Sequence, residues 1–355
     1  MALEYFKATD FRCLAAVELD IDPSYNLVYG QNASGKTSLL EALSYMGRGK
    51  SFRGASVQNL VRHGAREFVL FGRTVNAGVS RHIGVRNGPA GLETSVDGVH
   101  DGGAAALAEA LPLQVIDPDI HDLVAGGPEQ RRRFLDWATF HVEHGYLDAW
   151  RRFRRALKQR NAALRQGAGA AELGGWDREF VATALVVDAA RRRAFDLLLP
   201  CLAEAAADLL GAEVAFDYRQ GWASEEDLAT ALVGAQGRDR QQGSSQVGPQ
   251  RADIRLVFDE RQARKMVSRG QQKLLACAMV LGATELVQGE LERKLLLLLD
   301  DPAAELDDRS LARLMARVAR LESQVIATAL QPQANLFPAP PRMFHVEQGI
   351  VSPAT

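Results

Sequence analysis

The sequence predicts an α/β protein in which a mixed sheet around a phosphate-binding loop carries an antiparallel β layer and a helical insertion. Three features of the 355-residue chain support this prediction. Residues 30–37 match a phosphate-binding loop, five leucines at 295–299 precede two aspartates, and from about residue 119 the pattern changes from strands to long amphipathic helices. The composition, 47% hydrophobic and 24% charged, is that of an ordinary globular protein.

The first part of the chain shows the two-residue alternation of β-strands. Val17, Leu19 and Ile21 alternate with acidic residues, and strand-like segments at 68–71 and 81–86 are followed, after a Gly-Pro-containing turn, by a return segment at 94–96. Strands joined by short turns pair in antiparallel fashion. We therefore expect an antiparallel layer here.

The phosphate-binding loop lies between a short apolar run and a segment of good helix formers. Its glycines let backbone N–H groups point at phosphate oxygens, its lysine reaches the outer phosphates, and its final hydroxyl can bind Mg²⁺. A strand, such a loop and a helix N-terminus together form an anion site. The predicted nucleotide-binding residues are Gly30, Gln31, Asn32, Ala33, Ser34, Gly35, Lys36 and Thr37.

The leucine run at 295–299 is typical of a fully buried parallel strand, and Asp300 and Asp301 follow it directly. Ligands of α/β sheets bind at the carboxyl ends of such strands. We expect Asp300 and Thr37 to hold Mg²⁺, and Asp301 to orient or deprotonate the attacking water. The predicted catalytic residues are therefore Lys36, Asp300 and Asp301.

A second anion site is predicted at the start of another helix. Ser268 is a favourable N-cap, and the helix expected over 271–287 leads directly to the leucine strand. Most Ser-x-Gly helix starts are only caps, so the spacing before that strand is what supports this prediction. Ser268, Gly270 and Gln271 are its predicted nucleotide contacts.

The middle of the chain is predicted to be mainly helical. Amphipathic helices are expected at 150–164, 180–199 and 201–210, with Pro200 separating the last two. Residues 234–246 are rich in Gly, Gln, Ser and Arg, which favours a flexible loop. The predicted domains are a nucleotide-binding domain of residues 1–115 and 247–355 and an insertion of residues 116–246.

The order of these motifs resembles that of the ATP-binding-cassette (ABC) class of ATPases. In that class the Ser-Gly segment completes the nucleotide site of the opposite subunit, and residues 304–307 resemble its D-loop, which crosses the dimer interface. Thr328 and its neighbours stand where the class often carries a switch histidine, which implies slow hydrolysis. The resemblance implies an ABC-type ATPase head with ATP and Mg²⁺ as cofactors.

Longer segments make the sequence similar to the RecF family of bacterial recombination ATPases. They span nearly the whole chain: GQNASGKTSLLEAL, SFRG, FVLFGR, GGPEQRRRFLDW, LKQRNAALRQ, SRGQQK, LLLLDDPAAELD and MFHVEQG. Gln250 stands where we expect histidine in this family, and Ala303 and Ala304 replace a more usual Ser-containing pair.

The resemblance implies an ATP-dependent homodimer that binds DNA near single-strand/double-strand junctions in recombinational repair and replication gap repair. It also implies cooperation with RecR, and more loosely RecO, in loading recombinase. One alternative is a nucleotide-gated scaffold in which ATP acts only as dimer glue. Another is an SMC-like chromosome-organising head, which needs hundreds of heptad-patterned residues where only about 230 intervene.

Two basic patches are candidates for the DNA contact. The net charge of −2 neither supports nor excludes DNA binding. Charges are screened beyond roughly 8 Å, so local basic patches determine phosphate binding. The first patch is preferred because such dimers bind duplex on the face around the nucleotide sites. The alternative for the second is a solvated helix face with local ion pairs. The first patch is Arg48, Lys50, Arg53, Arg62 and His63; the second is Arg131, Arg132, Arg133, Arg151, Arg152, Arg154, Arg155, Lys158, Arg160 and Arg165.

The chain is expected to be cytoplasmic and not attached to a membrane. Its N-terminus lacks a basic region followed by an apolar core, and no apolar run approaches the roughly 20 residues of a membrane span. Cys13, Cys201 and Cys277 lie far apart without C-x-x-C spacing, which favours a reducing compartment.

Overall fold

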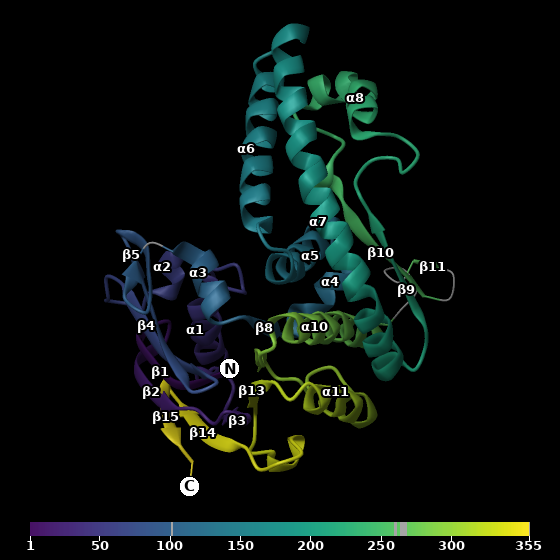
Figure 1. Cartoon of the computed structure of the whole chain (residues 1–355). Helices are drawn as coiled ribbons and strands as arrows, with labels where there is room; N and C mark the ends of the chain where they lie inside the picture. Colours follow the sequence, from purple (N-terminus) through teal and green to yellow (C-terminus); the bar gives the residue numbers. More distant parts are fainter. Residues whose placement is uncertain (101, 259–260, 263–267, 355) are drawn as a thin grey trace. The chain divides into compact units, whose positions relative to one another are not determined.

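The computed structural model describes residues 1–100, 102–258, 261–262 and 268–354, and the chain divides into two compact units (Figure 1). Unit 1 consists of Met1–Ile120 and Glu292–Thr355, and unit 2 of His121–Leu291. This division differs from the predicted one. Residues 247–291, expected in the nucleotide-binding domain, belong to unit 2 because their strand and their long helix pair and pack with elements of that unit.

The first sheet of unit 1 is antiparallel, as predicted. Within the described residues it has six strands in the order β2-β1-β4-β5-β6-β7. The strands predicted at 68–71, 81–86 and 94–96 pair here in antiparallel register. The members are β1 (Ala2–Phe11), β2 (Leu14–Asp20), β4 (Phe68–Asn76), β5 (Val79–Gly88), β6 (Gly91–Val96) and β7 (Val99–His100).

The second sheet of unit 1 is mixed and contains both strands that carry the predicted site. Its described strands follow the order β15-β14-β3-β13-β12-β8, all parallel except the antiparallel edge strand β15. β3, from the N-terminal part of the chain, therefore lies between two pairs of strands from the C-terminal part (Figure 1). The members are β3 (Tyr25–Tyr29), β8 (Leu113–Ile116), β12 (Leu296–Leu299), β13 (Gln324–Ala329), β14 (Arg342–Glu347) and β15 (Ile350–Pro353).

Helix α1 (Lys36–Arg48) contacts both sheets and fills the core of unit 1. Leu39, Leu43 and Met46 are buried against apolar side chains of both sheets, because their helical spacing gathers them on one face. The other helical elements that lie in this unit or reach its boundary are α2 (Val57–Leu60), α3 (Gly103–Ala110), η1 (Pro118–His121), α11 (Asp308–Arg320) and η3 (Ala334–Leu336).

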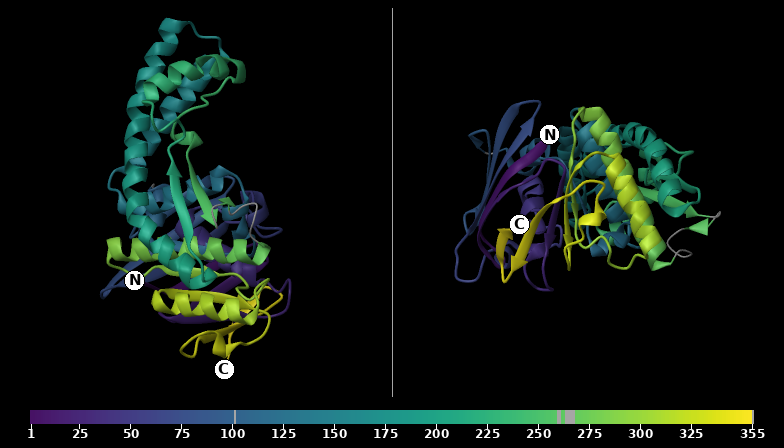
Figure 2. Two further views of the ribbon diagram at one scale, coloured as in Figure 1. Left: turned by 90° about the vertical axis from the view of Figure 1, so that its right-hand side faces the viewer. Right: turned by 90° about the horizontal axis from the view of Figure 1, so that it is seen from below.

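Unit 2 is mainly helical, with a small antiparallel sheet in the order β11-β10-β9 (Figure 2). Its long helices α6 and α7 run side by side, and α10 packs against α7. The elements are α4 (Asp122–Ala125), α5 (Pro128–Val142), α6 (Tyr146–Arg165), α7 (Ala170–Leu210), β9 (Val214–Arg219), α8 (Leu228–Gln242), η2 (Pro249–Arg251), β10 (Asp253–Phe258), β11 (Arg261–Gln262) and α10 (Arg269–Leu291).

Two local expectations in unit 2 were wrong. The helix predicted to break at Pro200 continues, since α7 passes through this residue and Leu198 and Leu202 on either side are fully buried. Packing of the apolar face outweighs the lost backbone donor. The flexible loop predicted at 234–246 is mostly helix α8, in which Leu232 and Ala235 are buried.

Helix α10 is long and apolar enough to pass a length-and-composition test for a membrane span, but 72% of that window is buried within the protein. Gly282 allows close packing here, because a Cβ at this position would lie 2.9 Å from the carbonyl oxygen of Cys201 in α7. A helix that is buried to this extent is typical of a protein core.

Candidate nucleotide-binding site

The phosphate-binding loop begins where β3 ends, at the carboxyl edge of the mixed sheet, as predicted. The Gly30 N–H donates to the carbonyl oxygen of Ala329 on the neighbouring strand at 3.3 Å. A Cβ at Gly30 would lie 2.2 Å from the carbonyl oxygen of Val346, so only glycine fits. Gly35 is the N-cap of α1, so the first turn of that helix, whose N–H groups have no intrahelical partners, directly follows the loop.

Lys36 lies across the loop. Its Nζ donates to the carbonyl oxygens of Gly30 at 2.7 Å and Gln31 at 2.9 Å. Burial lowers the pKa of Lys36, whereas the negative charges of Asp301 and Asp300 act to raise it. The ammonium group is therefore bonded to the loop and interacts electrostatically with the two aspartates that were predicted to share its site.

Asp300 and Thr37 meet at this edge. The Thr37 hydroxyl donates to Asp300 Oδ1 at 3.2 Å, and the Thr328 hydroxyl donates to the same oxygen at 2.8 Å. Burial raises the pKa of Asp300, while the hydrogen bonds from Thr328 and Thr37 and the positive charge of Arg53 lower it. A hydroxyl beside a carboxylate is a set of hard oxygen donors that fits Mg²⁺.

Asp301 follows with a backbone φ of 47°, in the left-handed region that non-glycine residues seldom adopt. Its N–H donates to Thr328 Oγ1 at 2.9 Å, so one threonine contacts both aspartates. Strained residues of this kind cluster at functional sites, where neighbouring contacts hold them in place. Thr328 was expected only to mark a missing histidine, and its double contact with the aspartates was not foreseen.

Asp117 is a further acidic residue at this edge that the sequence reasoning missed. It directly follows β8, and the Asp300 N–H donates to the carbonyl oxygen of Ile116 at 2.8 Å, so the two strand ends are neighbours. Burial raises the pKa of Asp117 to about 6, and the charges of Asp119 and Asp300 contribute to the shift. The available signal was the one used for Asp300: a short buried strand followed by an acid.

Ser268 is the N-cap of α10 in unit 2, as predicted. Its N–H donates to Gln271 Oε1 at 2.9 Å, and its Oγ accepts from the Gln271 N–H at 3.3 Å. This reciprocal pair is a capping box. Ser268 and Gln271 are exposed, and Gly270 is partly exposed, so the helix start is open to a ligand. Their contact with nucleotide stays a prediction.

Each basic patch is smaller than predicted. In the first patch, Arg48 donates to Gln114 Oε1 at 3.0 Å, and burial lowers its pKa to about 10. In the second, Arg131 pairs with Asp253 at 2.7 Å and Arg160 is fully buried. These three arginines are therefore bonded or buried within the protein, and they do not add to the exposed basic patches.

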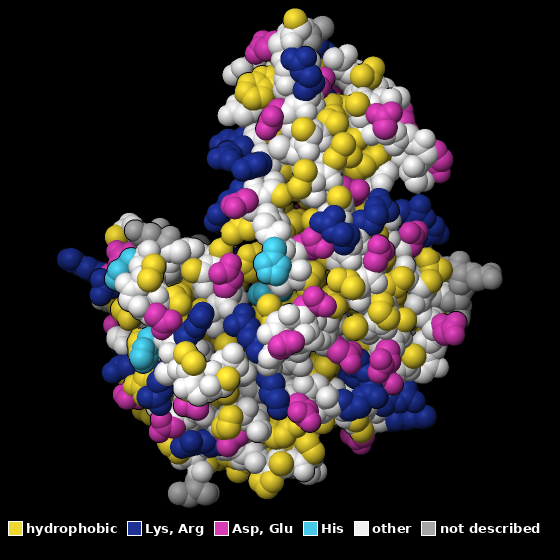
Figure 3. All heavy atoms as spheres, viewed as in Figure 1, with side chains coloured by type: hydrophobic (Ala, Val, Ile, Leu, Met, Phe, Trp, Pro, Cys, Tyr) yellow, Lys and Arg dark blue, Asp and Glu magenta, His cyan; other side chains and the backbone are white. Residues whose placement is uncertain are grey.

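Other members of the second patch are exposed along α6. They are Arg151, Arg152, Arg154, Arg155 and Lys158. Figure 3 shows basic side chains gathered over this helix of unit 2, with acidic ones between them. The guanidinium of Arg154 lies 5.1 Å from the ring centroid of Trp150. This face is therefore still a candidate for the predicted phosphate contacts.

The fold and this site define an ABC-type ATPase head with a helical insertion. The family model "RecF/RecN/SMC N terminal domain" matches residues 2–351. The chain is 38% identical to "DNA replication and repair protein RecF" of Pseudomonas aeruginosa (strain LESB58) over 363 residues, covering 100% of this chain and 98% of that protein. The Azotobacter vinelandii (strain DJ / ATCC BAA-1303) protein of the same name is also 38% identical, over 99% and 98% of the two chains. The chain belongs to the RecF family.

Solved structures agree on the fold. "Structure of the recombination mediator protein RecF-ATP in RecFOR pathway" superposes with a TM-score of 0.90 at 24% identity, covering 100% of this chain and 98% of the other. "Crystal structure of the SmcHead bound to the C-winged helix domain of ScpA" gives 0.61 at 15% identity, covering 100% and 97%. The fold class and the family predicted from the sequence are thus both confirmed.

Proposed function

We propose that this protein is an ATP-dependent DNA-binding ATPase of recombinational DNA repair and replication gap repair. The main support is that Lys36, Thr37 and Asp300 converge at one edge of the mixed sheet in a member of the RecF family. The relatives named above are DNA replication and repair proteins, and a structural neighbour is an ATP complex.

Each residue of the site has a distinct part in the proposed reaction. Lys36 and the loop N–H groups bind the outer phosphates of ATP. Thr37 and Asp300 hold Mg²⁺, which supplies charge neutralisation for phosphoryl transfer when bound. Asp301 orients or deprotonates the attacking water, and Thr328 holds both aspartates. Hydrolysis is proposed to be slow, because a threonine stands at the position of the switch histidine.

The site is proposed to be completed by a second copy of the chain. Ser268, Gly270 and Gln271 of that copy contact the nucleotide through their exposed helix start, which favours an anion. Two nucleotides held between two subunits couple ATP binding to dimerisation by mass action. The dimer then closes on DNA near single-strand/double-strand junctions.

The proposal extends to partners and location. The structural neighbour is described as part of the RecFOR pathway, which supports RecR and RecO as partners in recombinase loading. We propose a cytoplasmic location. In the alternative of a nucleotide-gated scaffold, ATP would serve only as dimer glue and the parent protein would release no phosphate. The intact Asp300-Asp301 pair favours hydrolysis.

Replacement of Ser268 tests the shared site. We expect Ser268→Ala to weaken ATP-driven dimerisation in analytical ultracentrifugation, with ATP affinity of the dilute monomer little changed, because the hydroxyl acts on the other subunit's nucleotide. The variant also loses a helix cap, worth about 1 kcal/mol. Asp227→Ala is the matched control, since Asp227 caps α8 in the same unit through the Thr230 N–H.

Two further arms complete this experiment. Ser268→Thr should retain dimerisation because it keeps the hydroxyl, and Lys36→Ala should abolish ATP-driven dimerisation because it removes phosphate binding. A Ser268→Ala protein that dimerises like the parent would refute the shared site while leaving nucleotide binding intact.

A further inference from the structure

The C-terminal hairpin meets the phosphate-binding loop at its turn. β14 runs parallel to β3, with His345 opposite Tyr29, and β15 returns antiparallel to β14. The turn residues Gln348 and Gly349 have φ values of 49° and 80°, both in the left-handed region, as in a two-residue hairpin turn. This turn ends the MFHVEQG segment, to which the chemistry proposed above gives no part.

Backbone contacts join the hairpin to the loop. The Gly349 N–H donates to the carbonyl oxygen of Ser34 at 2.8 Å. A Cβ at Gly35 would lie 3.4 Å from the Cα of Gly349, and one at Gly30 would lie 2.2 Å from the carbonyl oxygen of Val346. The hairpin therefore lies close to the loop at three loop residues, Gly30, Ser34 and Gly35.

The turn between β1 and β2 also packs against the hairpin. Gly349 is buried, and a Cβ there would lie 2.4 Å from the carbonyl oxygen of Cys13. Cys13 Sγ is 3.5 Å from Ser38 Oγ in the first turn of α1, and Arg12 pairs with the fully buried Glu41 of α1 at 2.8 Å. Gly349 is thus held between the β1–β2 turn and the loop.

We propose that Gly349 is a positioning residue for nucleotide binding. Its N–H fixes the Ser34 peptide, and this peptide sets the direction in which the neighbouring loop N–H groups point at a nucleoside triphosphate. The Ser34 Oγ is buried without a hydrogen-bond partner among the described residues. The orientation of this hydroxyl therefore also depends on the Ser34 peptide. The inference rests on the nucleotide binding proposed above.

A second turn in unit 1 provides a matched control. Asp97 and Gly98, between β6 and β7, have φ values of 52° and 80°, nearly the same as Gln348 and Gly349. A Cβ at Gly98 would meet no atom of the described chain within 4 Å. Gly98→Ala therefore introduces the same backbone strain as Gly349→Ala, without the clash at Cys13 and without a link to the loop.

The test is a titration of a fluorescent N-methylanthraniloyl ATP analogue into the parent, Gly349→Ala and Gly98→Ala, with circular dichroism to confirm folding. We expect Gly349→Ala to bind about tenfold or more weakly and Gly98→Ala to bind like the parent. Equal affinity of the two variants would overturn the role of Gly349. A parent that does not bind the analogue would instead refute the proposed function.

Hydrogen exchange on the unaltered protein keeps the proposal testable if Gly349→Ala does not fold. Saturating ATP and Mg²⁺ should slow amide exchange both in the loop and in the turn at Gly349, because the two share a hydrogen bond. Protection of the loop with no change at the turn would count against the proposal. The turn at Gly98 should exchange equally with and without ATP.

Discussion

At the scale of single residues, Thr328 links the two aspartates that are predicted to be catalytic. Its fully buried hydroxyl donates to Asp300 and accepts from the N–H of Asp301, so it fixes the side chain that directly follows β12 and the next backbone N–H. A group that donates to a carboxylate favours its ionised form, and this opposes the burial that raises the pKa of Asp300. Thr328 thus favours the ionised form of Asp300, which is the form that the proposed Mg²⁺ site requires.

We predict that Thr328→Val lowers kcat by about tenfold or more, with a smaller effect on KM for ATP, because the isosteric side chain leaves the loop intact but releases both aspartates. The acidic limb of the pH–rate profile should move to higher pH, since the lost hydrogen bond lowered the pKa of Asp300. Steady-state phosphate release between pH 5 and 9 measures both effects.

Thr284→Val is the matched control for this prediction. Thr284 is also fully buried, and its hydroxyl donates to the carbonyl oxygen of Val280 at 2.8 Å within α10 of unit 2. Thr328→Ser should recover most of the activity because it restores the hydroxyl. A Thr328→Val enzyme with the parent's kcat and pH profile would remove Thr328 from the site.

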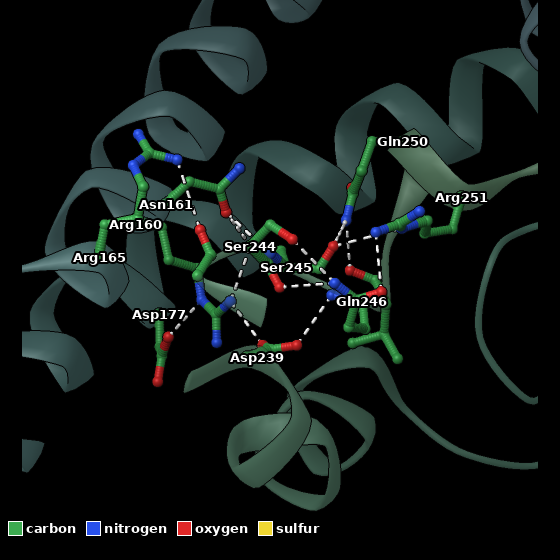
Figure 4. A network of polar contacts seen from close by, with 12 residues as sticks. Arg160, Asn161, Arg165, Asp177, Asp239, Ser244, Ser245, Gln246, Gln250 and Arg251 are labelled. Carbon is green, nitrogen blue, oxygen red and sulfur yellow. Dashed lines mark hydrogen bonds and ion pairs between the residues drawn. The ribbon is translucent and has the colours of Figure 1, made fainter. Parts of the chain in front are cut away.

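At the scale of secondary-structure elements, one buried arginine joins helices α6, α7 and α8 of unit 2 (Figure 4). Arg160 of α6 donates to Asp177 of α7, Asp239 of α8 and Ser245, each at 2.7 Å. Arg160 was predicted to be one of the possible DNA contacts. It lies seven residues after Phe153 and four before Leu164, so its helical position is on the apolar face, and that spacing was the missed signal.

We predict that Asp239→Ala destabilises unit 2 by about 3–5 kcal/mol, because it leaves a buried guanidinium without one of its carboxylates. All four tryptophans of the chain lie in unit 2, so their fluorescence during urea unfolding reports on this unit alone. Asp148→Ala is the control, since its pair with Arg151 is exposed, and it should change the stability by no more than about 0.5 kcal/mol. If Asp239→Ala lowers the stability of unit 2 no more than Asp148→Ala does, the role of the Arg160 network is refuted.

At the scale of the whole molecule, local patterns predicted much and distant pairings little. The strand, loop and helix around Lys36 and the strand before Asp300 are encoded in short windows, and the structure has them as expected. The assignment of residues 247–291 to unit 2 depends on strand pairing with β9 and on packing with α7, which no window contains. For the same reason the contact of Gly349 with Ser34 could not be predicted.

We predict that ATP is required for tight binding to gapped duplex, and that affinity falls steeply with salt. A clamp that neutralises about six phosphates loses roughly a thousandfold in affinity between about 50 and 200 mM salt. Fluorescence anisotropy with gapped and blunt duplexes, with and without ATP, measures this. Equal binding with and without ATP would refute the clamp.

The same titration identifies the basic patch that contacts DNA. Arg62→Ala changes the first patch and Arg155→Ala the second, and both side chains are exposed. The variant at the contacting patch should reduce the salt slope by about one, because one phosphate contact is lost. An unchanged slope in both variants would place the contact elsewhere.

The strand order of the mixed sheet has a consequence for how the protein is made. The phosphate-binding loop is complete at Thr37, but β3 lies between β13 and β14, which leave the ribosome about 300 residues later. At about 5–20 residues per second, β3 waits roughly 15–60 s for its partners. During that interval the backbone of β3 is an open edge for a chaperone or another chain.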